Sequence, residues 1–251
     1  MTASLSIGIA AAAGAEIAAA LAPVMEERGF HALWVNDTPD AEALEVLAAA
    51  AQVTDRLVLA TGVLPVDRRE PHEILTRVET LGLPVDRLVL GIGAGQQAKG
   101  ALDRVHDAAR SLRAGTTARV VVGALGPKMR TLGAEASDGL LLSWLTPDLA
   151  AAQASEAHGL VPDTRVVLYV RTAMDAAASP RLHDEAARYG AYPAYAANFA
   201  RLGIAPLDTV IEPGQDRLGA YRAAVDEVVL RAITSGDTAA DYLRFVEAVE
   251  L

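Results

Sequence analysis

The chain has 251 residues, of which 52% are hydrophobic, so it is long and apolar enough for one large α/β domain or two small ones. Only 4% of the residues are aromatic, so we expect a core made mainly of Ala, Leu and Val. A net charge of -10 argues against nucleic-acid and anionic-membrane partners, and the lack of cysteine excludes disulfides, thiolate metal sites and cysteine nucleophiles.

The N-terminal apolar run has no basic segment before it and follows the pattern of a strand, a loop and a helix. This pattern predicts neither a signal peptide nor a membrane-spanning helix. We therefore expect a cytoplasmic protein.

Short β-type apolar runs alternate with longer segments of helical spacing along the whole chain. The runs predict strands at residues 5–9, 30–35, 56–64, 85–90, 118–123, 138–143, 165–171 and 226–231. The other segments predict helices at residues 15–28, 41–53, 71–81, 101–113, 127–134, 147–158, 180–202, 215–224 and 238–251. Gly29 is expected to cap the first helix and Pro23 to kink or break it. Gly190 and Pro193 are expected to interrupt the segment 180–202.

The alternation of eight apolar strands with helices predicts a parallel sheet. Eight such units in about 250 residues is the usual size of a TIM (β/α)₈ barrel, with an open doubly wound sheet as the alternative. No linker-like stretch divides the chain, so we expect a single domain over residues 1–251. In a TIM barrel, the residues at the C-terminal ends of the strands form the active site.

Three alternate glycines, Gly91, Gly93 and Gly95, follow the apolar run 85–90. Glycines at the end of a strand allow another group to approach the backbone closely, although tight packing or a bulge explains them equally well. A dinucleotide-binding turn is not supported, because the spacing is G-x-G-x-G and no acidic residue ends the next strand.

Six motifs occur in the same order as in a known family. They are Glu27-Arg28-Gly29-Phe30 with Leu33-Trp34-Val35-Asn36-Asp37, Thr54-Asp55-Arg56-Leu57 with Thr61-Gly62-Val63, Arg87 to Gly95, Gly123-Ala124-Leu125-Gly126-Pro127-Lys128-Met129, Ala136-Ser137-Asp138-Gly139-Leu140-Leu141 and Val225-Asp226-Glu227-Val228-Val229-Leu230. With these motifs the chain resembles the luciferase-like monooxygenase superfamily, whose members are TIM-barrel enzymes that use FMN or the deazaflavin coenzyme F-420. The A-x-G-P and Trp-Val-x-Asp motifs and the alanine-rich composition are most similar to the F-420-dependent branch.

The resemblance implies a set of site residues at the ends of the strands. Asp37 would lie near the cofactor as an acid that holds or polarises cofactor or substrate, unless it is an ordinary loop aspartate. Thr61, Gly62 and Val63 match the family's bulge, where a non-prolyl cis peptide lies behind the cofactor ring; the same residues could also form a plain strand-end turn. We therefore expect a cis or distorted peptide at Gly62–Val63 or Thr61–Gly62. Gly93, Gly95 and Gln96 would line the cofactor pocket.

The resemblance also implies a position for the cofactor tail. Gly123, Ala124, Gly126 and Pro127 would bring backbone N–H groups and a helix N-terminus to its phosphate, with Lys128 and Arg130 as nearby cations. Ser143, at the end of another strand, completes the expected cofactor contacts. Of all these residues, Asp37 and Gln96 are the expected catalytic ones.

Several residues depart from the family pattern. Thr38 and Gln96 stand where some F-420-dependent members carry a catalytic histidine and a catalytic glutamate, so the acid–base pair of the sugar-phosphate dehydrogenase subgroup is not supported. Only residues 97–100 follow Gln96 where family members usually insert a long loop. The five histidines share no spacing, and no metal site is predicted. We interpret the pairs Arg68–Arg69 and Arg110–Arg113 as solvated surface charge.

These features predict an oxidoreductase that transfers a hydride between coenzyme F-420 and a small organic substrate. The alternatives are an FMN-dependent monooxygenase and a shortened, non-catalytic flavin-binding homologue. We expect F-420 to bind in preference to FMN. We also expect a homodimer, because family members pair through barrel helices and small side chains, as in 41–53, allow helices to approach closely.

Overall fold

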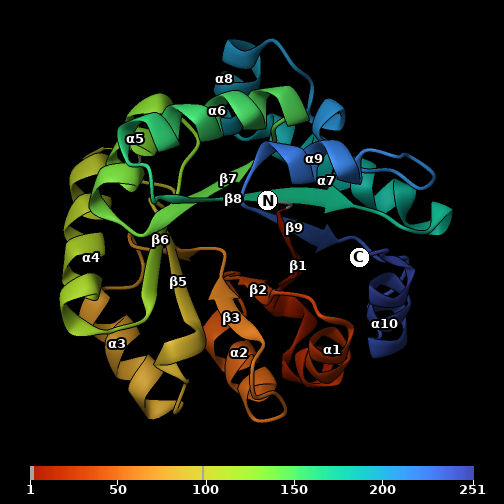
Figure 1. The fold of residues 1–251 in the computed structure, drawn as a ribbon, viewed down its shortest axis with the longest axis horizontal. Helices are drawn as coiled ribbons and strands as arrows, with labels where there is room; N and C mark the ends of the chain where they lie inside the picture. Colours follow the sequence, from red (N-terminus) through yellow and green to blue (C-terminus); the bar gives the residue numbers. More distant parts are fainter. Residues whose placement is uncertain (1–2, 98) are drawn as a thin grey trace.

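The computed structural model describes residues 3–97 and 99–251, and its strands form a closed parallel barrel ringed by helices (Figure 1). The strands are β1 (Ser4–Ala10), β2 (Ala32–Asn36), β3 (Val58–Thr61), β4 (Leu64–Pro65), β5 (Leu88–Gly93), β6 (Arg119–Gly123), β7 (Gly139–Ser143), β8 (Arg165–Thr172) and β9 (Glu227–Ala232). Their order is β3-β2-β1-β9-β8-β7-β6-β5-β4, and pairing of β3 with β5 closes the ring. Because β3 and β4 are two pieces of one barrel strand, the predicted (β/α)₈ barrel is confirmed.

The helices surround the barrel (Figure 1). They are α1 (Ala15–Arg28), α2 (Ala43–Ala51), α3 (Pro71–Thr80), α4 (Ala101–Gly115), α5 (Pro127–Ala136), α6 (Pro147–Leu160), α7 (Ser179–Ala191), α8 (Pro193–Leu202), α9 (Leu218–Ala224) and α10 (Ala239–Ala248). One helix follows most strands, but α7, α8 and α9 all lie between β8 and β9. None of the helices within residues 3–97 and 99–251 is long and apolar enough to cross a bilayer.

Some predicted boundaries are wrong. Residues Val85–Arg87 form a 3₁₀ turn instead of the start of a strand, and β5 runs on through Gly93. Helix α1 continues through Pro23 without a break, and it ends as predicted at Gly29, whose φ of 86° is left-handed. Gly190 stays inside α7, and only Pro193, which can occupy the first turn of a new helix, separates α7 from α8.

The interior of the barrel is filled by side chains that point inward from the strands. Trp34 and Tyr169 are the large members of this inner cluster, with their ring centroids 6.1 Å apart in an edge-on arrangement. The second, larger layer of core lies between the strands and the helices and is rich in Leu, Val and Ala. The inner layer fills the barrel, so a ligand site formed by the strands has to lie at one of its two mouths.

Several residues of the family-like motifs hold the N-terminal end of the barrel together. The Arg87 guanidinium donates to the carbonyl oxygens of Ala51 at 3.0 Å, Thr54 at 2.6 Å and Leu57 at 2.8 Å. Asp138 Oδ2 accepts from the N–H of Val120 at 2.8 Å. These bonds join loops that precede neighbouring strands, so this end of the barrel is tied mainly for stability.

Candidate functional site

The bond between Gly62 and Val63 is a cis peptide. This confirms the expected cis or distorted peptide at this position. The N–H of Gly62 donates to the Val35 carbonyl at 2.8 Å, and the Gly62 carbonyl accepts from the Asn36 side-chain amide. The break between β3 and β4 therefore lies at the C-terminal mouth, beside the end of β2.

The Val63 side chain covers the ends of the two next strands. A Cβ atom built on Gly93 would lie 2.6 Å from Val63 Cγ2, and one built on Gly123 would lie 2.9 Å from Val63 Cγ1. Both positions thus require glycine for the valine to rest where it does. The predicted residues Gly62, Val63, Gly93 and Gly123 are brought together, and they form an apolar platform at the mouth.

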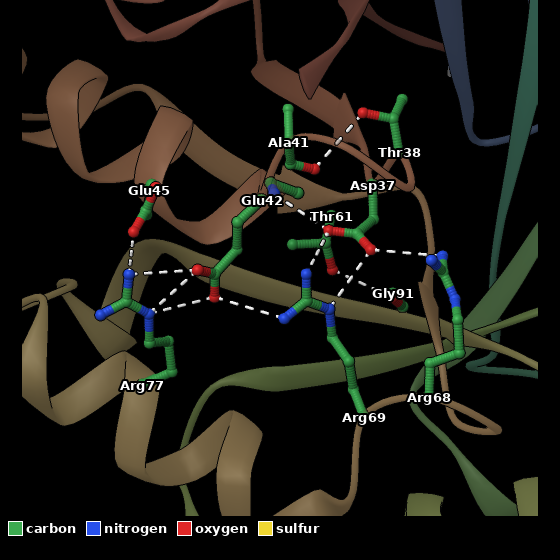
Figure 2. A network of polar contacts seen from close by, with 11 residues as sticks. Asp37, Thr38, Ala41, Glu42, Glu45, Thr61, Arg68, Arg69, Arg77 and Gly91 are labelled. Carbon is green, nitrogen blue, oxygen red and sulfur yellow. Dashed lines mark hydrogen bonds and ion pairs between the residues drawn. The ribbon is translucent and has the colours of Figure 1, made fainter. Parts of the chain in front are cut away.

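Asp37 lies at the end of β2 with its side chain fully buried in an ion-pair network (Figure 2). Arg69 donates to it from Nε at 3.2 Å and from Nη2 at 3.1 Å, and Arg68 Nη2 lies 3.7 Å away. The N–H of Ala43 also donates to Asp37 Oδ1 at 3.1 Å. Arg69 therefore pairs with a buried carboxylate, which the interpretation of Arg68 and Arg69 as solvated surface charge did not foresee, while Arg68 stays half exposed.

The network continues from Arg69 to Glu42 at 3.5 Å and on to Arg77, which also pairs with Glu45 (Figure 2). It ties the loop after β2 to the segment after β4. These two segments lie on either side of the cis peptide, so the network holds the platform in place. A contact between Asp37 and a cofactor or substrate stays a prediction.

The loop after β5 is fixed by Asp67. Its Oδ2 accepts from the N–H groups of Gln96 at 2.8 Å and Gln97 at 3.2 Å. Gly95 has a φ of 70°, and a Cβ there would lie 1.8 Å from Asp67 Oδ1, so only glycine fits. Gln96 is exposed at the rim of the mouth, and its catalytic role stays a prediction.

The turn after β6 leads into the N-terminus of α5. The N–H of Ala124 donates to the Leu141 carbonyl at 3.0 Å, so that group is engaged within the protein. Gly126 is the N-cap and Pro127 the first residue, and no side chain caps this helix. Uncapped N–H groups and the helix dipole make such an end favourable for an anion. Arg130 is not a free cation, because it is buried and bound to Glu156 at 2.5 Å.

A third part of the mouth combines strand-end residues, which the sequence places there, with helix residues that it does not. The Arg171 guanidinium, at the end of β8, lies 4.1 Å from the ring centroid of Trp144 and 4.8 Å from that of Tyr189. Its Nε donates to Glu185 at 3.2 Å. Trp144 follows β7, while Tyr189 and Glu185 belong to α7, so α7 covers the ends of β7 and β8. Phe199 of α8 also packs edge-on against Trp144, with ring centroids 5.9 Å apart.

Within the described residues, several polar atoms near this mouth are buried and have no hydrogen-bond partner, and four of them concern the ends of β2, β7 and β8 and the inner cluster. These four are Asn36 Oδ1, Trp144 Nε1, Tyr169 Oη and Arg171 Nη1. A buried polar group without a partner is unfavourable, and such groups cluster where a ligand or water completes them. Burial also raises the pKa of Tyr195 to about 12, so this phenol is neutral at neutral pH.

The sequence indicated only some of the residues in this third part of the mouth. Ser143 and Arg171 end predicted strands, and that is a signal for a site at the mouth of a barrel. Their aromatic partners come from helices whose sequence reads simply as amphipathic. Within the described residues, no cluster of three or more His, Asp or Glu side chains could hold a metal ion.

Comparisons with known proteins agree with this geometry. Residues 5–114 match the model of the family described as luciferase-like monooxygenase. A search of curated proteins found no match.

Three solved structures share the fold over almost the whole chain. An F-420-dependent secondary alcohol dehydrogenase, in complex with an F-420–acetone adduct, is 15% identical with a TM-score of 0.70, covering 99% of this chain and 98% of that one. The coenzyme F-420-dependent tetrahydromethanopterin reductase of Methanopyrus kandleri is 16% identical, with a TM-score of 0.70 and 99% coverage of both chains. The oxygenating constituent of 3,6-diketocamphane monooxygenase from Pseudomonas putida, in complex with FMN, is 14% identical with a TM-score of 0.67, covering 97% and 96%.

At these identities the three structures show a common fold. The family match covers the first half of the barrel, including β3, the cis peptide and β5. The resemblance to the luciferase-like monooxygenase family is thus confirmed, with residues 5–114 matching the family and the whole chain folding as its structural neighbours do.

Proposed function

We propose that the protein is an oxidoreductase that binds coenzyme F-420 in preference to FMN and transfers a hydride between it and a small organic substrate. The observation that carries the proposal is the apolar platform that Val63 forms over Gly93 and Gly123, next to the cis peptide. A flat ring system can rest on such an apolar surface at the mouth of an otherwise filled barrel. Neighbours of the same fold bind F-420 in one case and FMN in another.

The residues present fit a cofactor with a flat ring and a phosphate. Val63 would contact the ring, and Asn36, whose Oδ1 is buried without a partner among the described residues, would accept a hydrogen bond from a ring N–H. The uncapped N-terminus of α5 would take the phosphate. When bound, a flavin or deazaflavin supplies the hydride acceptor or donor, which no protein side chain can.

The chain itself would position the substrate and exclude water. Arg171 and Trp144 each keep an N–H without a partner among the described residues, so they would donate to an oxygen of the substrate. Helices α7 and α8 cover this side of the mouth and would keep water from it. We propose Gln96 as a further contact at the open rim, where its amide can bind but cannot take up a proton at neutral pH.

The two alternative functions, an FMN-dependent monooxygenase and a non-catalytic homologue, make different demands on the site. An FMN monooxygenase would use the same platform and phosphate site. A non-catalytic homologue would keep the platform without substrate turnover, and the short segment after Gln96 favours it, because a longer loop commonly closes over the chemistry.

Gly126→Asp tests the assignment of the pocket. A Cβ at Gly126 meets nothing within 4 Å, and aspartate is a good N-cap, so this variant is expected to fold and to place a carboxylate where the phosphate would bind. Separate titrations with F-420 and FMN, each followed by the fluorescence of the added cofactor, should show tighter binding of F-420 to the parent. Binding should be lost in Gly126→Asp and kept in the control Gly126→Ala.

Equal binding of F-420 to Gly126→Asp and to the parent would move the phosphate site elsewhere. Tighter binding of FMN than of F-420 would favour the monooxygenase alternative. No binding of either cofactor would contradict the proposal.

A further inference from the structure

A groove with basic walls runs along the outside of the barrel between α4 and α5, with a volume of about 540 Å³. Its charged lining residues are His106, Arg110 and Arg113 from α4 and Lys128 and Glu135 from α5. Leu102 and Leu132 add apolar surface. The groove thus has four basic side chains and one acidic side chain, although the chain as a whole has a net charge of -10.

Two of these cations have no carboxylate partner among residues 3–97 and 99–251. Arg110 and Lys128 are exposed, and neither takes part in an ion pair with any residue of the described ranges. His106 lies 3.1 Å from Asp107, and Arg113 lies 3.2 Å from Asp138, so these two are partly compensated. The unpaired cations are therefore Lys128, at the start of α5, and Arg110, in the second half of α4.

The direction of the groove follows from the topology. Each helix of the barrel begins at the C-terminal mouth and runs back along the outside, and α4 and α5 lie side by side (Figure 1). Lys128 is the second residue of α5, next to its uncapped N-terminus, whereas Arg113 is near the far end of α4. The groove thus starts beside the proposed phosphate site and leads away for about 15 Å, the length of α5.

We infer that this groove binds the γ-linked oligoglutamate tail of coenzyme F-420. The inference rests on the proposed function, because the tail is attached beyond the phosphate that α5 would hold. An extended polycarboxylate matches the groove in sign and direction, and its side carboxylates can pair in turn with Lys128, Arg110 and Arg113. FMN ends at its phosphate, so the groove would select the deazaflavin coenzyme over FMN.

The test compares two ligands that share the ring and phosphate. One is F-420 with its full oligoglutamate tail, and the other is the same coenzyme after enzymatic or chemical removal of the tail. The groove variant is Arg110→Glu/Lys128→Glu. The control, Arg56→Glu/Arg244→Glu, changes the net charge equally at exposed sites outside the groove, on the loop before β3 and on α10 across the barrel (Figure 1).

The parent should bind the tailed coenzyme about tenfold or more tightly than the tailless one at low salt, a difference of about 1.4 kcal/mol. The groove variant should lose this preference, and the control should keep most of it. Near 1 M salt, where the screening length falls to about 3 Å, the preference should shrink in all three proteins.

Failures of the two proposals can be told apart. If neither form of the coenzyme binds the parent, the proposed function is wrong. If both forms bind the parent equally, or if groove variant and control lose the preference alike, the cofactor site stands and the groove is not a tail site. A groove variant that changes oligomeric state by light scattering but keeps the preference would identify a contact between copies instead, and would overturn the inference.

Discussion

At the scale of single residues, Glu227 at the start of β9 places a carboxylate inside the N-terminal mouth of the barrel. Its side chain is 2% exposed and accepts from Ser6 Oγ and Trp34 Nε1, both at 2.7 Å, and from Arg165 at 2.9 Å. Arg165 Nε donates a fourth hydrogen bond at 3.1 Å, so each carboxylate oxygen accepts two bonds, which compensates the burial of the charge. His31 Nε2 lies 3.7 Å from the same carboxylate.

His31 makes the stability of the protein depend on pH. Burial lowers the pKa of His31; the charge of Glu227 opposes this shift, and those of Arg165 and Arg119 add to it. The unfolded chain therefore binds the proton more readily, and this contribution to stability is present above about pH 6.5 and lost as the pH falls through the folded-state pKa. In urea denaturation between about pH 7.5 and pH 5, the parent should lose more stability than His31→Gln. Parallel curves for the two proteins would contradict this assignment.

At the scale of secondary structure, the parallel pairing of β5 with the broken strand formed by β3 and β4 depends on Gly91. A Cβ there would lie 1.9 Å from the carbonyl oxygen of Thr61, and that oxygen belongs to backbone that cannot move aside cheaply. Thr61 also bonds to Gly91 through its hydroxyl, at 2.9 Å from the Gly91 carbonyl. The two strands are thus locked just before the cis peptide.

Gly91→Ala is expected to reduce the free energy of unfolding by at least the roughly 1–3 kcal/mol of an overpacked core. The matched control is Gly159→Ala in α6, where a Cβ meets nothing within 4 Å. That change should raise stability, by up to about 0.8–1 kcal/mol in a helix interior and less near the end of α6. Thermal and urea unfolding of both variants measure the difference. Equal stability of Gly91→Ala and the parent would mean that β3 and β5 are not locked as described.

At the scale of the whole molecule, assembly into a homodimer stays a prediction. Most of the small residues of α2 that suggested it, including Ala43 and Ala50, are buried within the chain, where α2 packs against α1. A dimer would therefore form through other exposed surface of the barrel helices. Light scattering at high micromolar concentration should give twice the chain mass, and a monomeric mass would refute the prediction.

The sequence by itself determined the elements and the class of fold. The periodicity of hydrophobic residues and the breaks made by glycine and proline are local signals that extend over a few residues. From these signals all eight barrel strands were located, and α1 was predicted with both of its ends correct. The site of the cis peptide came from resemblance to a family, because Thr61-Gly62-Val63 alone reads equally well as a turn. The run 85–90 was only half right, since Pro84 precedes a 3₁₀ turn before β5 begins.

The tertiary structure decided what the site residues touch. Asp37 and Arg69 are 32 positions apart, and Arg171 meets Trp144 across neighbouring strands, so neither pairing has a local signal. The same holds for the groove, because Arg110 and Lys128 line one surface only when α4 and α5 lie side by side. Local patterns fix which face of an element is buried, whereas closure of the barrel fixes which distant side chains share a mouth, and ligand chemistry depends on the second.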